Sequence, residues 1–251
     1  MNMTGNTLLI TGGNSGIGRG LAEAFHALGN QVIIAGRSKK NLDETIAANP
    51  GMKSFILDME NADAIHTFAA NIIGEYPTLN VLINNAGIMC AENLLAPQNG
   101  LADMEATITT NLLAPIRLTS ALLPHLQQQP QSTIINVSSG LVFVPLTHTP
   151  TYNATKAALH SYTQALRFQL RDTSTQVIEL IPPAVATELM AGGSSNPRAM
   201  PLADYISESM HLLQTQPSAA EICVEQVKFL RFAAESGNYE PVFNMLNPVS
   251  A

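Results

Sequence analysis

Charged residues are scarce in this chain, and basic residues are the scarcest of them. Asp, Glu, Lys and Arg make up 12% of the 251 residues, about half of the usual fraction of roughly 25%. The 12 Lys and Arg against 19 Asp and Glu give a formal net charge of −7. Binding to nucleic acid needs a basic face, so we expect no nucleic-acid partner and no docking on anionic lipid. The low charge also favours a homo-oligomer, because a monomer has more surface to cover with polar groups.

Cysteines and long apolar runs are also nearly absent. The two cysteines, Cys90 and Cys223, form no CxxC motif, which argues against a disulfide scaffold and against a metal site. The longest stretch without a charged residue, 118–155, is interrupted by Gln127–Gln129 and four prolines, so we expect no membrane span. The N-terminus lacks the basic segment of a signal peptide, and we predict a cytoplasmic protein.

Short apolar runs alternate with longer amphipathic segments along most of the chain. Continuous runs of Val, Ile and Leu are typical of parallel strands that are buried on both faces. Because helical segments separate these runs, we predict one α/β domain over residues 1–251, with a Rossmann-like, doubly wound parallel sheet and helices on both faces. The predicted strands are Thr7–Ile10, Gln31–Ala35, Ser54–Leu57, Val81–Ile83, Thr133–Val137 and Val177–Ile181. The predicted helices lie near Ile17–Leu28, Leu42–Ala48, Ala62–Glu75, Leu101–Leu126 and Tyr152–Arg171.

The pattern changes after the sixth predicted strand. Glycines, serines and prolines over about 187–217 predict a substrate flap built around one helix, Leu202–Leu213. We expect a last helix over about Ala219–Glu235, with Gly237 in the C′ position that ends it. The tail Tyr239–Asn247 is expected to supply a weak final strand.

The first predicted strand runs directly into a glycine-rich turn, and a helix follows. Glycines permit positive φ and the close approach of a pyrophosphate, while the helix start offers unpaired N–H groups to an anion. A tight strand–helix turn needs glycine in any case, so the motif by itself is weak evidence; its place between strand and helix favours a dinucleotide site. The residues expected to bind the nucleotide here are Gly12, Asn14, Ser15, Gly16, Ile17, Gly18 and Arg19.

The end of the second predicted strand indicates which dinucleotide binds. A carboxylate there would bind the ribose 2′-hydroxyl of NAD, but the sequence has Gly36 and Arg37. Arg37, together with Arg19, is suited to hold a 2′-phosphate, so we predict NADP and regard NAD as the less favoured cofactor. The alternative is that Arg37 belongs to a solvated turn, which is our interpretation of Lys39 and Lys40.

Two further features fit acid–base chemistry. Tyr152 and Lys156 are spaced i and i+4, which places them on one face of a predicted helix. A nearby ammonium lowers the pKa of a phenol towards the range that proton transfer requires. Ser138 and Ser139 follow the fifth predicted strand, at the carboxyl edge of the sheet where ligands bind. Tyr-x-x-x-Lys is common by chance, so its combination with the serines and the glycine turn carries the prediction.

Other motifs lie at predicted strand ends and in the long helix, namely Asp58, Asn84–Gly87 and Asn111. With Thr11–Gly18, Ser139, Tyr152 and Lys156, they resemble the motifs of the single-domain short-chain dehydrogenases/reductases. The resemblance covers nearly the whole chain. It implies a seven-stranded parallel sheet in the order 3-2-1-4-5-6-7, and hydride transfer between NADP(H) and an alcohol or carbonyl substrate.

The resemblance also implies a role for each of four residues. Tyr152 would be the general acid in reduction and the general base in oxidation. Lys156 would lower the pKa of Tyr152 and hold the nicotinamide ribose. Ser139 would hydrogen-bond the substrate oxygen, with its neighbour Ser138 as the alternative. Asn111 would kink its helix and hold a water that relays protons to Lys156.

Further residues are expected beside the nucleotide on the same grounds. Asp58 and Met59 would flank the adenine, although Asp58 is equally suited to cap the following helix. The sequence departs from the family after the sixth strand, where Pro183 replaces the usual glycine and stiffens the turn. The remaining residues expected at the nucleotide are Asn85, Ala86, Gly87, Pro182, Val185 and Thr187.

The segments expected to line the substrate pocket are mostly apolar, which favours an apolar or aromatic carbonyl compound over a sugar phosphate. The family's frequent acid-Gly-Gly ending is missing, so we expect a dimer through the helices Leu101–Leu126 and Tyr152–Arg171 rather than a tetramer. The alternatives to an NADP-dependent reductase are an NAD-preferring alcohol dehydrogenase, a dinucleotide-binding redox sensor, and an epimerase or dehydratase. The expected pocket residues are Ile88, Met89, Leu141, Phe143 and His148.

Overall fold

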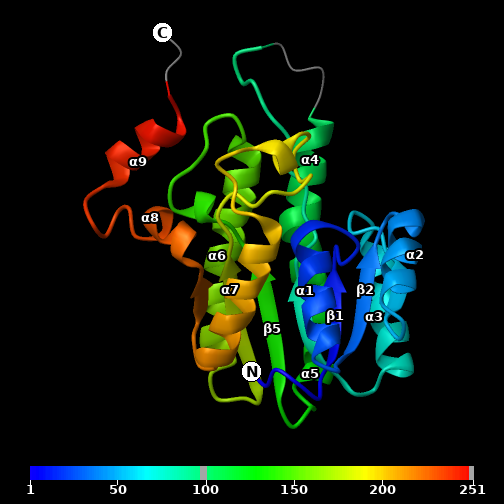
Figure 1. Ribbon diagram of the computed structural model, residues 1–251. Coiled ribbons are helices and arrows are strands. Elements are labelled where there is room, and N and C mark those ends of the chain that lie inside the picture. Colours follow the sequence, from blue (N-terminus) through cyan, green and yellow to red (C-terminus); the bar gives the residue numbers. More distant parts are fainter. Residues whose placement is uncertain (97–100, 249–251) are drawn as a thin grey trace.

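The computed structural model describes residues 1–96 and 101–248, which form a seven-stranded sheet with helices on both faces (Figure 1). All neighbouring strands pair in parallel, and their order is β3-β2-β1-β4-β5-β6-β7. The predicted doubly wound parallel sheet and its strand order are confirmed. The strands are β1 Thr7–Thr11, β2 Gln31–Gly36, β3 Lys53–Ile56, β4 Leu79–Asn84, β5 Ser132–Val137, β6 Thr175–Ile181 and β7 Glu221–Cys223.

Most helices lie close to their predicted bounds, but the long one predicted over 101–126 is not uniform. That segment is helical almost throughout, and a π-helical stretch, Thr109–Leu113, separates its two α-helices. Within the described part of the chain, no helix is both long enough and apolar enough to cross a bilayer. The α-helices are α1 Gly16–Ala27, α2 Lys39–Ala48, α3 Ala62–Glu75, α4 Ala102–Ile108, α5 Ala114–Leu126, α6 Pro150–Gln169, α7 Leu202–Thr215, α8 Lys228–Arg231 and α9 Tyr239–Leu246.

Both faces of the central strands are buried, which explains why they lack alternating polar residues. In β1, Leu8 and Ile10 belong to one hydrophobic core and Leu9 to the other, and all three are fully buried. Side chains alternate between the two faces along a strand, so one continuous apolar run fills two cores. Residues of α1 and α7 cover the first core, and residues of α3 and α5 cover the second.

The two elements expected after the flap were assigned wrongly. Residues predicted as a helix over Ala219–Glu235 instead form β7 and the short helix α8, while the tail predicted as a strand forms α9. Ile222 is buried and pairs with Leu180 of β6, so sheet pairing decided the conformation over local preference. Gly237 does have a positive φ, +72°, but α8 ends at Arg231, so Gly237 lies in a turn before α9 and does not end the helix as predicted.

The register of the sheet brings four loops to the same edge. Near the ends of the strands, Asn84 of β4 pairs with Asn136 of β5, and Val137 of β5 pairs with Leu180 of β6. β1 pairs with β4 up to Ile10 and Ile83. The segments that follow these four strands therefore begin side by side, at the carboxyl edge where open α/β sheets bind ligands.

Candidate active site

The glycine-rich turn after β1 needs glycine for two reasons. Gly12 and Gly16 have φ of +67° and +50°, which residues with a side chain rarely adopt. A Cβ on Gly18 would lie 2.3 Å from the Gly12 carbonyl oxygen, so no side chain fits there. Ser15, the N-cap of α1, makes no side-chain capping bond, so its hydroxyl does not satisfy the first N–H groups of the helix. This backbone fits a pyrophosphate.

Two other residues of the turn, Asn14 and Ile17, pack against the rest of the fold. A Cβ on Gly36, at the end of β2, would lie 2.4 Å from Asn14 Oδ1, so the strand end and the Asn14 side chain are in close contact. Ile17 packs against the first hydrophobic core. Both contacts hold the turn against the fold, so Asn14 and Ile17 have a structural role in addition to the predicted binding of the nucleotide.

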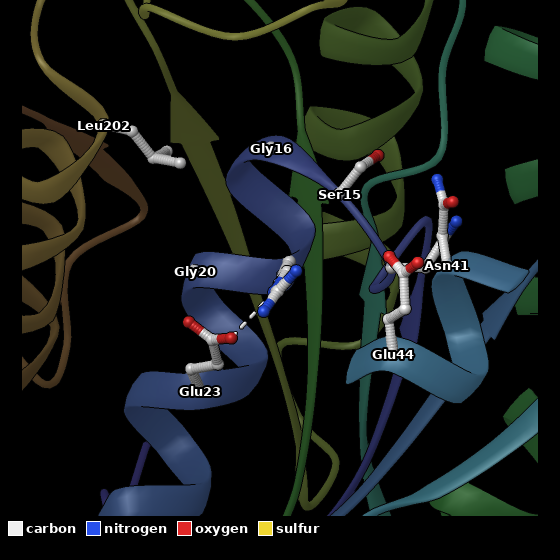
Figure 2. A pocket seen from close by; sticks show the side chains of 9 residues that line it. Ser15, Gly16, Gly20, Glu23, Asn41, Glu44 and Leu202 are labelled. Carbon is white, nitrogen blue, oxygen red and sulfur yellow. Dashed lines mark hydrogen bonds and ion pairs between the residues drawn. The ribbon is translucent and has the colours of Figure 1, made fainter. Parts of the chain in front are cut away.

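A hollow of about 480 Å³ lies beside the turn. Figure 2 shows Asn41 and Glu44 of α2 on one side of it and Glu23 of α1 on the other. Sequence analysis identified none of these three residues, although the i, i+4 spacing of Arg19 and Glu23 was an available signal. The other lining residues are Asn14, Ser15, Gly16, Arg19, Gly20 and Leu202.

The two predicted phosphate-binding arginines each have a carboxylate partner. Arg19 Nε lies 2.7 Å from Glu23 Oε1, and an Arg37 guanidinium nitrogen lies 3.0 Å from Glu60 Oε1. Arg19 lines the hollow, whereas Arg37 does not, and the Arg37 side chain is 57% exposed. The structure therefore places Arg19 at the hollow, and Arg37 outside its lining, exposed and paired with Glu60. Lys39, interpreted as solvated, is exposed.

Asp58 does not cap the helix that follows it. The N-cap of α3 is Asn61, whose side-chain oxygen accepts a hydrogen bond from the Ala64 N–H at 3.0 Å. Asp58 Oδ1 instead accepts one from the Glu60 N–H at 3.0 Å. Because the Asn61 side chain, and not that of Asp58, bonds to the first turn of the helix, the capping alternative for Asp58 is wrong. Its neighbour Met59 is buried.

The segment after β4 is bonded directly to the glycine turn. Thr11 Oγ1 accepts hydrogen bonds from the N–H groups of Asn85 at 3.0 Å and Ala86 at 3.1 Å. The Asn85 side chain donates to the Thr11 carbonyl at 3.0 Å. A Cβ on Gly87 would lie 3.2 Å from Asn111 Oδ1 and 3.7 Å from Lys156 Nζ. These predicted residues therefore join the turn to the cluster of polar residues described next.

Tyr152, Lys156, Ser139 and Asn111 converge at the carboxyl edge of the sheet, and all four are buried. Lys156 Nζ lies 5.7 Å from the centre of the Tyr152 ring and donates to the Val137 carbonyl at 2.8 Å. Asn111, in the π-helical stretch, exchanges two hydrogen bonds with the backbone of Ile88 at 2.8 and 2.9 Å. A π-helical turn is frequent at functional sites, and here it presents Asn111 to the segment after β4.

Burial dominates the pKa values of this cluster. It raises the pKa of Tyr152 to about 12, and a hydrogen bond with Ser139 opposes the rise. Burial also lowers the pKa of Lys156 to about 8, against the attraction of Glu179. Desolvation disfavours the phenolate and the ammonium alike. The prediction that the Tyr152 pKa lies below its usual value is therefore wrong for this structure. The Lys156 ammonium, which was expected to lower it, bonds to the Val137 carbonyl.

The two serines after β5 differ in their surroundings. Ser139 Oγ accepts a hydrogen bond from the Leu141 N–H at 3.1 Å and also bonds to Tyr152. Ser138 Oγ is buried and has no hydrogen-bond partner within the described residues. This arrangement favours Ser139, as predicted, as the serine that faces the same space as the phenol.

The segment after β6 closes over the glycine turn. The Pro182 carbonyl accepts from the Gly140 N–H at 2.9 Å, and Val185 forms an isolated bridge with Met200. The Thr187 side chain lies 3.4 Å from the position of a Cβ on Gly16. Val185 and Thr187 are thus on the segment that passes beside the predicted nucleotide site.

Residues 6–197 match the family described as short chain dehydrogenase. A relative from Bacillus subtilis (strain 168), "Uncharacterized oxidoreductase DltE", is 39% identical and is aligned over 98% of this chain and 98% of its own length. A metagenomic short-chain oxidoreductase, solved in complex with NADP, is 27% identical with a TM-score of 0.74 over 89% of this chain and 98% of its own. A short chain dehydrogenase/reductase from Burkholderia phymatum, solved with NAD, is 20% identical with a TM-score of 0.81 over 100% of both chains, a likeness of fold alone.

Proposed function

The chain belongs to the short chain dehydrogenase family of oxidoreductases, and we propose that it interconverts an alcohol and a carbonyl compound with NADP(H) as cofactor. The observation that carries this proposal is the buried cluster of Tyr152, Ser139, Lys156 and Asn111 at the edge of the sheet that also holds the glycine turn. A phenol with a hydroxyl partner and an amine one helical turn away is suited to pass a proton to a carbonyl oxygen.

In this proposal each residue of the cluster has one task. Ser139 holds the substrate oxygen, and Tyr152 donates its phenolic proton to that oxygen in reduction and takes it back in oxidation. The raised pKa keeps Tyr152 protonated at neutral pH, which suits the reductive direction. Lys156 and Asn111 fix the surroundings of the phenol. Lys156 donates to the Val137 carbonyl, and Asn111 donates to the Ile88 carbonyl. The bound nicotinamide supplies or accepts the hydride.

The nucleotide site supports NADP over NAD. The end of β2 carries Arg37 where an NAD-preferring site has a carboxylate, and Arg19 lines the hollow next to the turn. A phosphate carries more charge than a carboxylate and has three acceptor oxygens, so it can take Arg37 from Glu60. Asp58, Met59, Asn85, Ala86, Gly87, Pro182, Val185 and Thr187 complete the proposed nucleotide site.

The substrate we propose is an apolar or aromatic aldehyde or ketone. The backbone N–H of Ile88 bonds to Asn111 and that of Leu141 bonds to Ser139, so two apolar residues lie beside the cluster. Phe143 packs edge-on against His160 of α6. A panel of aldehydes, ketones and alcohols, followed through nicotinamide absorbance with NADPH and NADH, tests both the reaction and the substrate class.

We also propose a homodimer through α4, α5 and α6. Ile108, just before the π-helical stretch, and Leu113, its last residue, are 41% and 38% exposed, and Phe168 of α6 is 67% exposed. Apolar side chains that protrude from adjoining helices are typical of an interface between subunits. Sedimentation equilibrium of the purified chain should give twice the mass of the protomer, and a monomer at high concentration would refute the dimer.

The substitution Tyr152→Phe tests the proposed chemistry directly. It removes the proton donor but keeps the ring in its buried position, so we expect kcat to fall about 10²-fold or more. The Kd for NADPH, measured by its fluorescence, should stay at the wild-type value because the ring and the glycine turn are unchanged. A variant that turns over as fast as the wild type would refute the assignment of Tyr152.

A further inference from the structure

One glutamate outside the motifs above joins two loops at the candidate active site. Glu92 lies in the segment after β4, and its carboxylate accepts two hydrogen bonds from Thr151. The Thr151 N–H donates to Oε1 at 3.0 Å and the Thr151 hydroxyl donates to Oε2 at 2.7 Å. The N–H of Glu92 donates to the His148 carbonyl at 2.8 Å. Three hydrogen bonds therefore attach this one residue to the beginning of α6.

The beginning of α6 lacks a cap of its own. Thr149 is its N-cap residue but makes no side-chain capping bond, and the first turn contains no acidic residue. A carboxylate at a helix N-terminus satisfies the unpaired N–H groups and is attracted by the helix dipole. Glu92 supplies this group from 59 positions earlier in the chain.

The capped turn is the part of α6 that carries Tyr152, the residue directly after Thr151. Further along, α6 is held by other bonds, such as the one from Lys156 Nζ to Val137. The position of the phenol therefore depends on the first turn. That turn is held by Glu92 together with the Asn153 side chain, which donates to the Leu146 carbonyl at 2.7 Å. His148 and Ile88 lie on the two segments that Glu92 joins, so the same residue fixes the spacing between two walls of the proposed pocket.

We propose that Glu92 is a positioning residue: its carboxylate clamps the first turn of α6 and so holds the Tyr152 phenol in line with the substrate oxygen. This inference rests on the proposed role of Tyr152. Because a small displacement of a reacting group can lower the rate about 10²-fold, loss of the clamp should affect turnover more than nucleotide binding.

Two nearly isosteric substitutions test the clamp. Glu92→Gln removes the charge and one acceptor, while Thr151→Val removes the hydroxyl but keeps the backbone N–H. We expect each to lower kcat about tenfold and to leave the Kd for NADPH unchanged, and Thr151→Ser should restore turnover. The double variant should be no slower than the slower single variant, since both remove the same contact. Glu240→Gln, at an exposed position of α9, is the matched control and should have wild-type kcat.

Hydrogen exchange gives a readout that does not depend on activity. The amides of residues 151–153 should exchange faster in Glu92→Gln than in the wild type, while those of the second half of α6 should not change. Wild-type kcat in both single variants, or unchanged exchange at 151–153, would overturn the proposal. A wild-type protein inactive on every carbonyl tested would refute the proposed function instead, and the exchange rates would still decide whether Glu92 fixes the helix start.

Discussion

At the scale of single residues, burial moves the pKa values of Tyr152 and Lys156 in opposite directions. The Tyr152 pKa rises to about 12 and the Lys156 pKa falls to about 8, because desolvation disfavours whichever form carries charge. At neutral pH the phenol therefore keeps its proton and the amine keeps its charge. A protonated phenol can donate to a carbonyl oxygen, and a nearby ammonium would stabilise the phenolate left behind.

The Lys156 pKa leads to a prediction about pH. Above about pH 8 the ammonium loses its proton, so kcat/KM for carbonyl reduction should decline as the pH rises through this value. The measurement is a profile between about pH 6 and about pH 10 at constant ionic strength with saturating NADPH. A profile that stays level across pH 8 would contradict the role given to Lys156.

Arg37 leads to a prediction about cofactor choice. Arg37→Asp removes the proposed phosphate ligand and adds a repulsive charge, so the ratio of kcat/KM for NADPH over NADH should fall about tenfold or more. Lys39→Asp is the matched control, because Lys39 is 70% exposed and pairs with Asp43 of its own helix. A wild type that already prefers NADH at equal salt would refute the NADP assignment.

At the scale of elements, the C-terminal helix fixes the loop that precedes α6. Asn247, just after α9, accepts a hydrogen bond from the Thr147 N–H at 2.7 Å and donates one to the Pro145 carbonyl at 3.0 Å. Figure 1 shows α9 at the same end of the molecule as α4 and the loop after β4. A segment near the end of the chain thus supports a wall of the proposed substrate pocket.

The substitution Asn247→Ala tests this support. It removes both hydrogen bonds to the loop, at a cost of about 1–3 kcal/mol, and should raise KM for the carbonyl substrate several-fold. The Kd for NADPH should not change, because the glycine turn lies on other elements. Asn244→Ala, at an exposed position of α9, serves as the control; equal KM values in the two variants would contradict the role of Asn247.

At the scale of the whole molecule, a buried polar cluster joins α6 to the last two strands. Glu179 of β6 is fully buried, and its two oxygens lie 3.0 and 2.8 Å from His160 Nδ1. The hydrogen bond from His160 to Glu179 raises the His160 pKa, burial opposes the rise, and Glu221 and Arg231 also act on it. The folded protein therefore binds this proton more tightly than the unfolded chain does.

This cluster leads to a prediction about stability. The contribution of His160 to the free energy of unfolding is complete below the unfolded pKa of about 6.5. This contribution declines between the unfolded pKa and the higher pKa of the folded state, because in that interval the native protein still holds the proton that the unfolded chain has released. It is lost once the pH has risen through the folded pKa. Urea unfolding over this pH interval should show stability falling with pH in the wild type and less so in His160→Gln. Identical pH dependence in both proteins would contradict the prediction.

Local patterns predicted most of the fold and the centre of the site. Continuous apolar runs such as Thr7–Ile10 predicted the strands because both of their faces are buried. The i, i+4 spacing predicted that Tyr152 and Lys156 share a helix face, and the turn at Gly12–Gly18 was recognisable from its glycines. β7 was missed because a three-residue edge strand has too little pattern to outweigh the helical periodicity around it.

The amino-acid sequence by itself determined the order of strands and helices up to the sixth strand, the glycine turn and the shared helix face of Tyr152 and Lys156. Each of these depends on neighbours within a few positions, so it is visible in a local pattern, whereas the role of Asn111 came from the family resemblance. Only the tertiary structure decided which arginine lines the hollow, that burial raises the Tyr152 pKa, and that Glu92 and Asn247 hold the segments around α6. These properties depend on desolvation and on contacts between residues far apart in the chain, and a one-dimensional pattern contains neither.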